Sequence, residues 1–380
     1  MTDIDKQMMS RALELAREGD PSPNPHVGCV IAKGETVVAE GFHQSVGNDH
    51  AEMAALRVAK ANPEELGASE ATRGATLYVT LEPCNHEGRT PPCVDAILKA
   101  GIKRVVIGCE DPNPSVEGGG IDRLREAGLD VTVGVARSEC EQLIRPWRKF
   151  ITQSSAYLIV KLALSLDGRI ATRSGSSKWI TGSEARTQVH ALRARYDAVM
   201  VGINTVLSDD PLLTVRDVKG RNPARVVVDS KLRIPVSSQL IATAQETPTC
   251  VVTTTDAPDS AVEAIEQRGV TIIRVPASPE GRCDMRAALK ELAAREVVSV
   301  LCEGGAELTG SLLANHIADE MHAFIAPIML GPRGLPGVLD WAGPESPSDA
   351  PRIEPPRWEL VGNDAYVSGP LVYPPPVLRT

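Results

Sequence analysis

Short apolar segments alternate with amphipathic ones in the first part of the chain. Segments 75–80, 103–108 and 130–133 have the β-branched composition of buried strands, and segments 93–100 and 118–127 between them have helical spacing. Strands that alternate with helices are typical of a sheet covered by helices on both faces. The sequence therefore predicts an α/β fold with a three-layer α/β/α domain.

The same alternation restarts after a polar break at residues 153–155. A chain of 380 residues is long enough for two or three domains. We expect two, over residues 1–150 and 151–380. In the second, strands are predicted at 157–163, 197–202, 225–229, 249–254, 297–302, 319–326 and 357–372, and helices at 183–194, 258–268, 284–294 and 306–314, with 331–356 and Pro374–Pro376 as loop and tail.

Turn signals mark the first elements of the first domain. Helical spacing over residues 3–18 stops at Gly19 and Pro21, and Lys33-Gly34 joins two strand-like segments in a hairpin. The two strands of the hairpin are predicted at 28–33 and 36–42. Further helices are predicted at 50–61 and 138–150.

Charge and hydropathy exclude several classes of partner. The net charge is −9 and no basic block is present, which argues against nucleic acid as a partner. No apolar run of 18 residues occurs and the first residues are acidic, so we expect no membrane segment and a cytoplasmic location. Eight cysteines are too few for a disulfide scaffold. Six are expected to be buried thiols: Cys29, Cys109, Cys140, Cys250, Cys283 and Cys302.

One histidine and two cysteines stand beside the helix and strand signals that are typical of a zinc site. His50-Ala51-Glu52 opens a predicted helix, Cys84 follows a predicted strand, and Cys93 opens another helix. Three protein ligands leave a fourth position for water, whose pKa zinc can lower to roughly 7. Glu52 lies two residues from His50, where it can transfer protons without being a ligand. The cluster therefore predicts zinc-dependent hydrolysis.

Two alternatives remain open for this cluster. Zinc deaminases carry H-x-E followed by P-C-x-x-C, whereas eight residues separate Cys84 from Cys93 here. The zinc could also be structural, with Glu52 an ordinary helix residue, and His86 could be a fourth ligand that blocks catalysis.

A longer pattern around these residues resembles a known family. Pro23-Asn24-Pro25-x-Val27-Gly28-Cys29, His50-Ala51-Glu52 and the segment from Leu81 to Cys93, with Gly88-Arg89-Thr90-Pro91-Pro92 between the cysteines, resemble the deaminase half of the bifunctional riboflavin-biosynthesis deaminase–reductases. In that family the wide cysteine spacing is normal. The resemblance implies His50, Cys84 and Cys93 as zinc ligands, Glu52 as the catalytic proton carrier, Asn24 as a pyrimidine contact, and His43 and His86 as neighbouring or substrate contacts.

In the second domain, the strongest signal is a strand that runs into a glycine turn. Segment 297–302 is followed by Glu303-Gly304-Gly305 and a predicted helix, an arrangement that can hold a phosphate at the helix N-terminus. It is not the G-x-G-x-x-G fingerprint of dinucleotide-binding folds. A tight packing turn is an equal interpretation of these residues alone.

Several segments of this domain resemble the reductase half of the same family, whose fold is like that of dihydrofolate reductase. These are 165–171, 177–181, 197–216 and 303–305. The resemblance implies NADPH contacts at Ala163, Trp179, Thr205, Asp209, Ser230, Gly305, Ala306, Glu307, Leu308, Thr309, Gly310 and Ser311, and substrate contacts at Ser177, Arg193, Leu213, Arg216 and Glu303. Lys161 and Asp167 are further candidates for substrate contact.

Arg193 and Arg216 suit a ribose phosphate, because a guanidinium group binds phosphate through two hydrogen bonds. A surface salt bridge is the alternative for both.

We expect a bifunctional enzyme with zinc and NADPH that deaminates a diaminopyrimidine ribose phosphate and reduces the product, acting as a homodimer or homotetramer. The alternatives are a deaminase for another nucleobase with a degenerate or differently specific reductase domain, and a non-catalytic zinc- and NADPH-binding protein.

Overall fold

The computed structural model describes residues 2–59, 69–86, 91–114, 119–331 and 341–375. The chain divides into two compact units, Met1–Ser154 and Ser155–Thr380. The first unit ends at Ser154, four residues after the expected boundary at 150, because helix α6 (Arg145–Gln153) continues to Gln153. The expected Gly88-Arg89-Thr90 insert and Pro376 of the tail lie outside the described residues, as does part of the 331–356 loop.

The first unit is built on a five-stranded sheet with the order β2-β1-β3-β4-β5. Strand β1 is antiparallel to both of its neighbours, and β3, β4 and β5 are parallel to one another. The strands are β1 (Gly28–Lys33), β2 (Thr36–Phe42), β3 (Thr76–Leu81), β4 (Arg104–Cys109) and β5 (Asp130–Val133).

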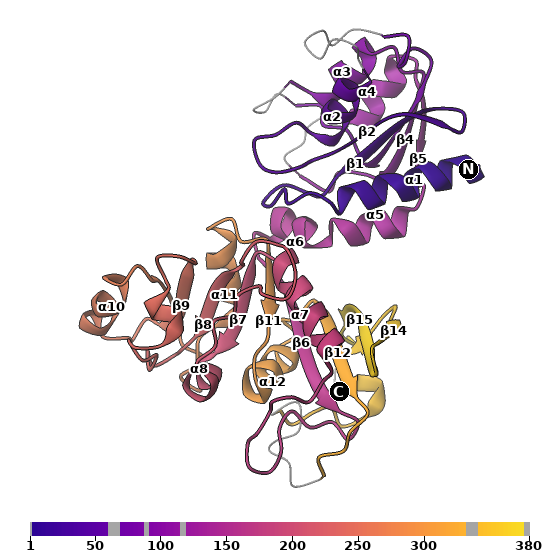
Figure 1. Ribbon diagram of the computed structural model, residues 1–380. Helices are drawn as coiled ribbons and strands as arrows, with labels where there is room; N and C mark the ends of the chain where they lie inside the picture. Colours follow the sequence, from indigo (N-terminus) through magenta and orange to yellow (C-terminus); the bar gives the residue numbers. More distant parts are fainter. Residues whose placement is uncertain (1, 60–68, 87–90, 115–118, 332–340, 376–380) are drawn as a thin grey trace, which may run out of the picture. The chain divides into compact units, whose positions relative to one another are not determined.

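Helices cover both faces of this sheet (Figure 1). Cys29 and Ile31 of β1 belong to a core shared with α2 (Ala51–Val58), α3 (Cys93–Lys99) and α4 (Gly120–Glu126). Val30 and Ala32 belong to a second core with α1 (Asp3–Ala16) and α5 (Arg137–Leu143). Alternate residues of a strand point to opposite faces, so this division confirms the predicted three layers.

The predicted helix 138–150 was wrong in one respect. The structure has two helices, α5 and α6, which meet at Ile144. Pro146 lies in the first turn of α6, where its ring is tolerated, whereas inside a continuous helix it would remove a hydrogen bond and clash with the preceding turn. Trp147 packs partly against the core of α1 and α5, and no residue of α6 is fully buried.

The second unit contains a ten-stranded sheet with the order β10-β9-β8-β7-β11-β6-β12-β15-β13, and β14 pairs with β15. The first seven strands in this order, from β10 at the edge to β12, are parallel to one another. Strand β15 is antiparallel to its neighbours. The strands are β6 (Tyr157–Ser165), β7 (Ala198–Gly202), β8 (Ala224–Val228), β9 (Thr249–Thr254), β10 (Thr271–Val275), β11 (Ser299–Cys302), β12 (Glu320–Ala326), β13 (Arg352–Ile353), β14 (Arg357–Val361) and β15 (Asp364–Val372).

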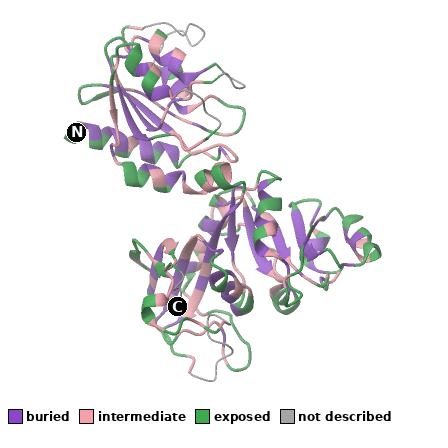
Figure 2. Cartoon of the chain, turned by 180° about the vertical axis from the view of Figure 1, so that it is seen from behind, coloured by how far each residue is buried: buried purple, intermediate pink, exposed green. Residues whose placement is uncertain are grey.

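Both faces of this sheet are also buried under helices (Figure 2). Leu158 and Val160 of β6 face a core with α11 (Met285–Ala293) and α12 (Ala306–Ala314), whereas Tyr157 and Ile159 face α7 (Ser183–Arg195). The remaining helices are α8 (Ile203–Asp209), α9 (Gln239–Ala242), α10 (Asp259–Glu266) and a short 3-10 helix at Pro347–Asp349.

The sequence did not predict β10, α8 or α9, which are short and carry no strong periodicity. Residues 357–372 form two strands instead of one, because the chain reverses at Gly362 with a positive φ of 62°. Part of the predicted 331–356 loop is ordered as β13. Among the described helices, none is long and apolar enough to span a membrane.

Candidate active sites

His50, Cys84 and Cys93 come together at the end of β3 and the starts of two helices. His50 is the residue before α2, Cys84 follows β3, and Cys93 is the first residue of α3. Their donor atoms lie within 4.8 Å of one another, and they form the single such group of His, Cys, Asp and Glu side chains among the described residues. The backbone N–H of Cys93 also donates to Cys84 Sγ at 3.3 Å.

The distances in this group are those of ligands on one metal ion. His50 Nδ1 lies 3.6 Å from Cys84 Sγ and 3.4 Å from Cys93 Sγ. With zinc bonds of about 2.0 Å to nitrogen and 2.3 Å to sulfur, tetrahedral geometry places the two donors about 3.5 Å apart. The three residues therefore fit a zinc ion, and the group contains no fourth His, Cys, Asp or Glu side chain among the described residues. His86 is exposed and lies outside the group, so it is not a fourth ligand in this structure.

Glu52 lies beside these donors and is only 4% exposed. Burial raises the pKa of Glu52 to about 7, and the nearby Cys84 adds to this rise. A carboxyl group with a pKa near neutrality can both accept and donate a proton at physiological pH. Glu52 is therefore not an ordinary solvated helix residue.

Asn24 and His43 form a hydrogen-bonded pair next to the donors. The His43 ring packs edge-on against that of His50, with centroids 5.4 Å apart. Nδ1 of His43 lies 2.9 Å from the carbonyl oxygen of Asp49, so Nδ1 carries the proton and donates it. Nε2 is then the acceptor for the Asn24 amide N–H at 3.1 Å. This pairing leaves the Asn24 carbonyl oxygen free of His43.

The cysteine loop is held by polar contacts that the sequence did not predict. Arg123 of α4 donates to Asn85, next to Cys84, at 2.6 Å and also pairs with Asp95 of α3. Glu82 accepts hydrogen bonds from the backbone N–H groups of Asp111 and Ile121 at 3.1 and 3.0 Å. No local pattern marks these contacts, because each joins segments far apart in the chain.

In the second unit, Glu303 is the centre of a largely buried ion-pair cluster, and its side chain is 8% exposed. Arg193 of α7 binds both carboxylate oxygens, at 2.5 and 3.0 Å, and Lys161 of β6 lies 3.3 Å from one of them. Burial opposes the charge on Glu303, but Arg193 and Lys161 more than offset this effect and lower its pKa to about 2. Arg193 is therefore neither a free phosphate ligand nor a surface salt bridge, since Glu303 occupies its guanidinium group.

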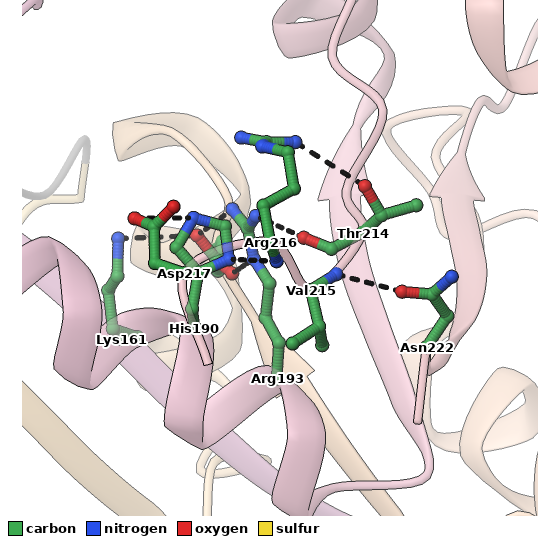
Figure 3. Close-up of polar contacts among 9 residues, drawn as sticks. Lys161, His190, Arg193, Thr214, Val215, Arg216, Asp217 and Asn222 are labelled. Carbon is green, nitrogen blue, oxygen red and sulfur yellow. Dashed lines mark hydrogen bonds and ion pairs between the residues drawn. The ribbon is translucent and has the colours of Figure 1, made fainter. Parts of the chain in front are cut away.

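Arg216 lies beside this cluster with its side chain exposed. His190 of α7 accepts the backbone N–H of Arg216 through Nδ1 at 3.3 Å, and its Nε2 lies 3.5 Å from Asp217 (Figure 3). The Arg216 side chain makes one long contact with Thr214, at 3.4 Å. It is thus more available than Arg193 for an anionic ligand. Leu213, also expected near the substrate, is buried.

A cavity of about 780 Å³ opens at the carboxyl ends of β6, β7, β8 and β11. A Cβ added at Gly305 would meet open space, so a ligand can approach the backbone where α12 begins. This is the place where dinucleotides bind in open α/β sheets. Seven of the expected NADPH contacts line it: Thr205, Ser230, Gly305, Ala306, Glu307, Leu308 and Ser311.

The other expected contacts lie elsewhere. Thr309 and Gly310 are buried within α12 and do not line the cavity, and Ala163, Asp209 and Trp179 are also outside its lining. Trp179 is 70% exposed under the guanidinium of Arg186.

The two remaining substrate candidates lie in loops that follow β6. Ser177 is exposed. Asp167 accepts hydrogen bonds from Ser165, Leu330 and Gly331, which lower its pKa to about 2. Both carboxylate oxygens of Asp167 thus bind the protein's own groups, which argues against a substrate contact.

Comparison with known proteins places both units in described families. Residues 156–367 match the RibD C-terminal domain, and residues 2–109 match the cytidine and deoxycytidylate deaminase zinc-binding region. The riboflavin biosynthesis protein RibD of Actinobacillus pleuropneumoniae is 40% identical over 376 residues, covering 98% of this chain and 96% of the relative. RibD of Escherichia coli is 39% identical and covers 95% and 97% of the two chains.

Solved structures agree over nearly the whole chain. RibD of Acinetobacter baumannii has a TM-score of 0.83 at 35% identity, covering 98% of this chain and 99% of the other. A diaminohydroxyphosphoribosylaminopyrimidine deaminase/5-amino-6-(5-phosphoribosylamino)uracil reductase from Thermotoga maritima has the same score, identity and coverage. This likeness confirms the expected fold, a cytidine-deaminase-like domain followed by a RibD reductase domain. The chain belongs to the RibD family of riboflavin biosynthesis proteins.

Proposed function

We propose that this chain catalyses two successive steps of riboflavin biosynthesis. Residues 1–154 deaminate 2,5-diamino-6-(5-phosphoribosylamino)pyrimidin-4(3H)-one, and residues 155–380 reduce the ribosyl chain of the product with NADPH, giving 5-amino-6-(5-phosphoribitylamino)uracil. The observation that carries this proposal is the three-donor cluster with a buried carboxyl beside it, in one chain with a reductase-like unit. The Thermotoga maritima relative is named for both activities.

In the first reaction, His50, Cys84 and Cys93 hold zinc, which when bound lowers the pKa of a water ligand and makes it a nucleophile at neutral pH. Glu52 accepts a proton from the attacking water and gives it to the amino group, which leaves as ammonia. Its carboxyl is buried beside the three donors, within reach of a water bound there.

Asn24 binds the pyrimidine through its carbonyl oxygen, which His43 does not use. His43 keeps the amide in that orientation, because its proton on Nδ1 is held by the Asp49 carbonyl and its Nε2 can only accept. His86 is exposed and outside the donor group, and we assign it a contact with the substrate.

In the second reaction, NADPH supplies the hydride and the protein supplies orientation. The charged Glu303, held by Arg193 and Lys161, offers a fixed acceptor for a ribose hydroxyl. Arg216 is exposed near this cluster and suits the phosphate of the substrate.

The two alternatives have less support. A deaminase with a degenerate reductase domain would not be expected to retain a buried, fully paired Glu303 and an open cavity at Gly305. A non-catalytic zinc protein would not need a buried carboxyl at position 52.

The deciding experiment follows ammonia release, NADPH consumption and zinc content on the same diaminopyrimidine substrate. Glu52→Gln should keep one zinc per chain and reduce ammonia release by at least about a hundredfold, the usual contribution of a general acid–base group. Glu126→Gln, an exposed substitution of the same kind on α4, is the matched control. Ammonia release at the wild-type rate in Glu52→Gln with zinc bound would disprove the mechanism.

We further propose that the protein is a cytoplasmic homodimer or homotetramer. All eight cysteines are free, as is usual in a reducing compartment. Strand β14 pairs only with β15 among the described strands, and its Trp358 and Leu360 are 62% and 81% exposed. Large apolar side chains on an edge strand are typical of an interface with another copy. Light scattering of the wild type and of Leu360→Asp tests this, because a monomeric wild type would exclude it.

A further inference from the structure

Residues 212–217 carry Arg216 beside the Glu303 cluster and form neither helix nor strand. Three neighbouring backbone groups of this segment are each bound by a side chain: the Thr214 carbonyl by Arg193 at 3.2 Å, the Val215 N–H by Asn222 at 2.9 Å, and the Arg216 N–H by His190 at 3.3 Å (Figure 3). We propose that His190 is a positioning residue of the second reaction, which fixes this segment so that Arg216 meets the phosphate of the substrate. The inference rests on the role proposed for Arg216.

His190 can make this contact in one protonation state only. A backbone N–H donates, so Nδ1 of His190 is the unprotonated, accepting nitrogen. The ring proton is then on Nε2, which lies 3.5 Å from Asp217 Oδ2. The neutral ring therefore contacts two consecutive residues of the segment, Arg216 and Asp217. A doubly protonated ring would direct its Nδ1–H at the N–H of Arg216 and break the first contact.

The position of His190 on α7 links the 212–217 segment to the buried ion pair. His190 and Arg193 are three residues apart, so they lie on the same side of the helix. Arg193 binds Glu303 and also donates to the Thr214 carbonyl. One side of α7 therefore holds both the carboxylate that is proposed to accept a ribose hydroxyl and the backbone that carries the proposed phosphate ligand.

The surroundings of His190 keep its ring neutral near physiological pH. The residue is 7% exposed, and burial lowers its pKa below the usual value. Arg193 and Arg216 act in the same direction, whereas Asp217 and Glu303 oppose them, so two cations and two anions act on the ring. Since the neutral ring is the one that accepts, the contact with the Arg216 N–H is present at neutral pH. It is lost as the pH falls through the lowered pKa.

The test follows NADPH oxidation by the full chain with 5-amino-6-(5-phosphoribosylamino)uracil and with its dephosphorylated form. His190→Leu removes the acceptor and keeps most of the apolar bulk of the ring. This variant should raise KM for the phosphorylated substrate by about fivefold to tenfold, the effect of one lost hydrogen bond, and change kcat less than about twofold. KM for the dephosphorylated form should change less than about twofold, because that form has no phosphate for Arg216 to bind. Circular dichroism confirms that each variant is folded.

His190→Asn is the conservative variant that should restore function. Its Oδ1 is attached to the same carbon as Nδ1 of the ring, so it can accept the Arg216 N–H, and it does not titrate. KM should stay within about twofold of the wild type at neutral pH. Below about pH 6.5, KM of the wild type should rise more steeply than that of His190→Asn. The phosphate of the substrate titrates near pH 6 in both proteins, so its effect cancels in the comparison. His316→Asn, an exposed change on the same unit, is the matched control and should follow the wild type.

Three results would overturn the inference alone: a wild-type KM in His190→Leu, equal losses with both substrates, or parallel pH profiles for the wild type and His190→Asn. Arg216→Ala separates these failures from that of the proposed function. A raised KM for the phosphorylated substrate in Arg216→Ala upholds the proposed role of Arg216 whatever His190→Leu does. A wild-type KM in Arg216→Ala would overturn both that role and the inference.

Discussion

Replacing Arg193 by methionine should destabilise the second unit by about 3 kcal/mol at neutral pH. The substitution keeps much of the apolar stem of the side chain but removes the guanidinium that binds both oxygens of Glu303. Glu303 then stays buried with Lys161 as its remaining cation in the cluster. Removing one partner of a buried ion pair destabilises a protein by more than the intact pair stabilises it. The remaining carboxylate has lost its hydration, and no partner offsets that loss.

The size of this effect follows from the pKa of Glu303. The cluster lowers this pKa from 4.5 to about 2. A difference of about 2.5 pKa units, to which both Arg193 and Lys161 contribute, corresponds to about 3 kcal/mol in favour of the charged, folded form and sets the order of magnitude of the effect. Because the folded pKa is depressed, this stability is present above pH 4.5 and is lost as the pH falls toward 2. The difference between wild type and Arg193→Met should therefore shrink below about pH 4.5.

Hydrogen exchange as a function of urea provides the measurement. Peptides from β6 and β11 report the free energy of opening of the second unit separately from the first. Arg195→Met, an exposed change on the same helix, is the control and should cost less than about 0.5 kcal/mol. A cost below about 1 kcal/mol for Arg193→Met would mean that the pair is solvated like a surface salt bridge, and would refute the reasoning.

Three further predictions concern the metal, a buried arginine and acid stability. Cys93→Ser should lower zinc affinity by at least about tenfold, measured by metal analysis after dialysis against a chelator, since it replaces a buried thiolate donor. Arg225→Met should cost about 3 kcal/mol or more in urea unfolding, because Arg225 is fully buried and donates to three carbonyl oxygens of the 240–247 segment, each of which would lose a charged donor. Asp5→Asn should flatten the loss of stability of the first unit as the pH falls below about 5, because the hydrogen bond from Arg104 holds the pKa of Asp5 well below its usual value. An unchanged pH profile would contradict this.

Local patterns in the sequence were enough for most elements and for the metal site. The donors His50, Cys84 and Cys93 each stand next to a helix or strand signal, and the contact of β3 with its neighbours brings these positions together. The central strands of both sheets were predicted from composition because they are buried on both faces, where side chains are apolar whichever way they point. Short elements such as β10 and α9 were missed, since four or five residues carry too little periodicity.

The sequence by itself determined which residues this protein has available for chemistry: a zinc ligand set, a carboxyl two residues from the histidine, and a glycine turn after a buried strand. Tertiary structure decided what several of them do. Arg193 meets Glu303 across 110 residues and so becomes part of a buried ion pair. Ser230 meets Cys283 across 53 residues and brings Arg282 to the cavity. The physical reason is that the order of strands in a parallel sheet sets which loops share an edge, and no local spacing encodes that order.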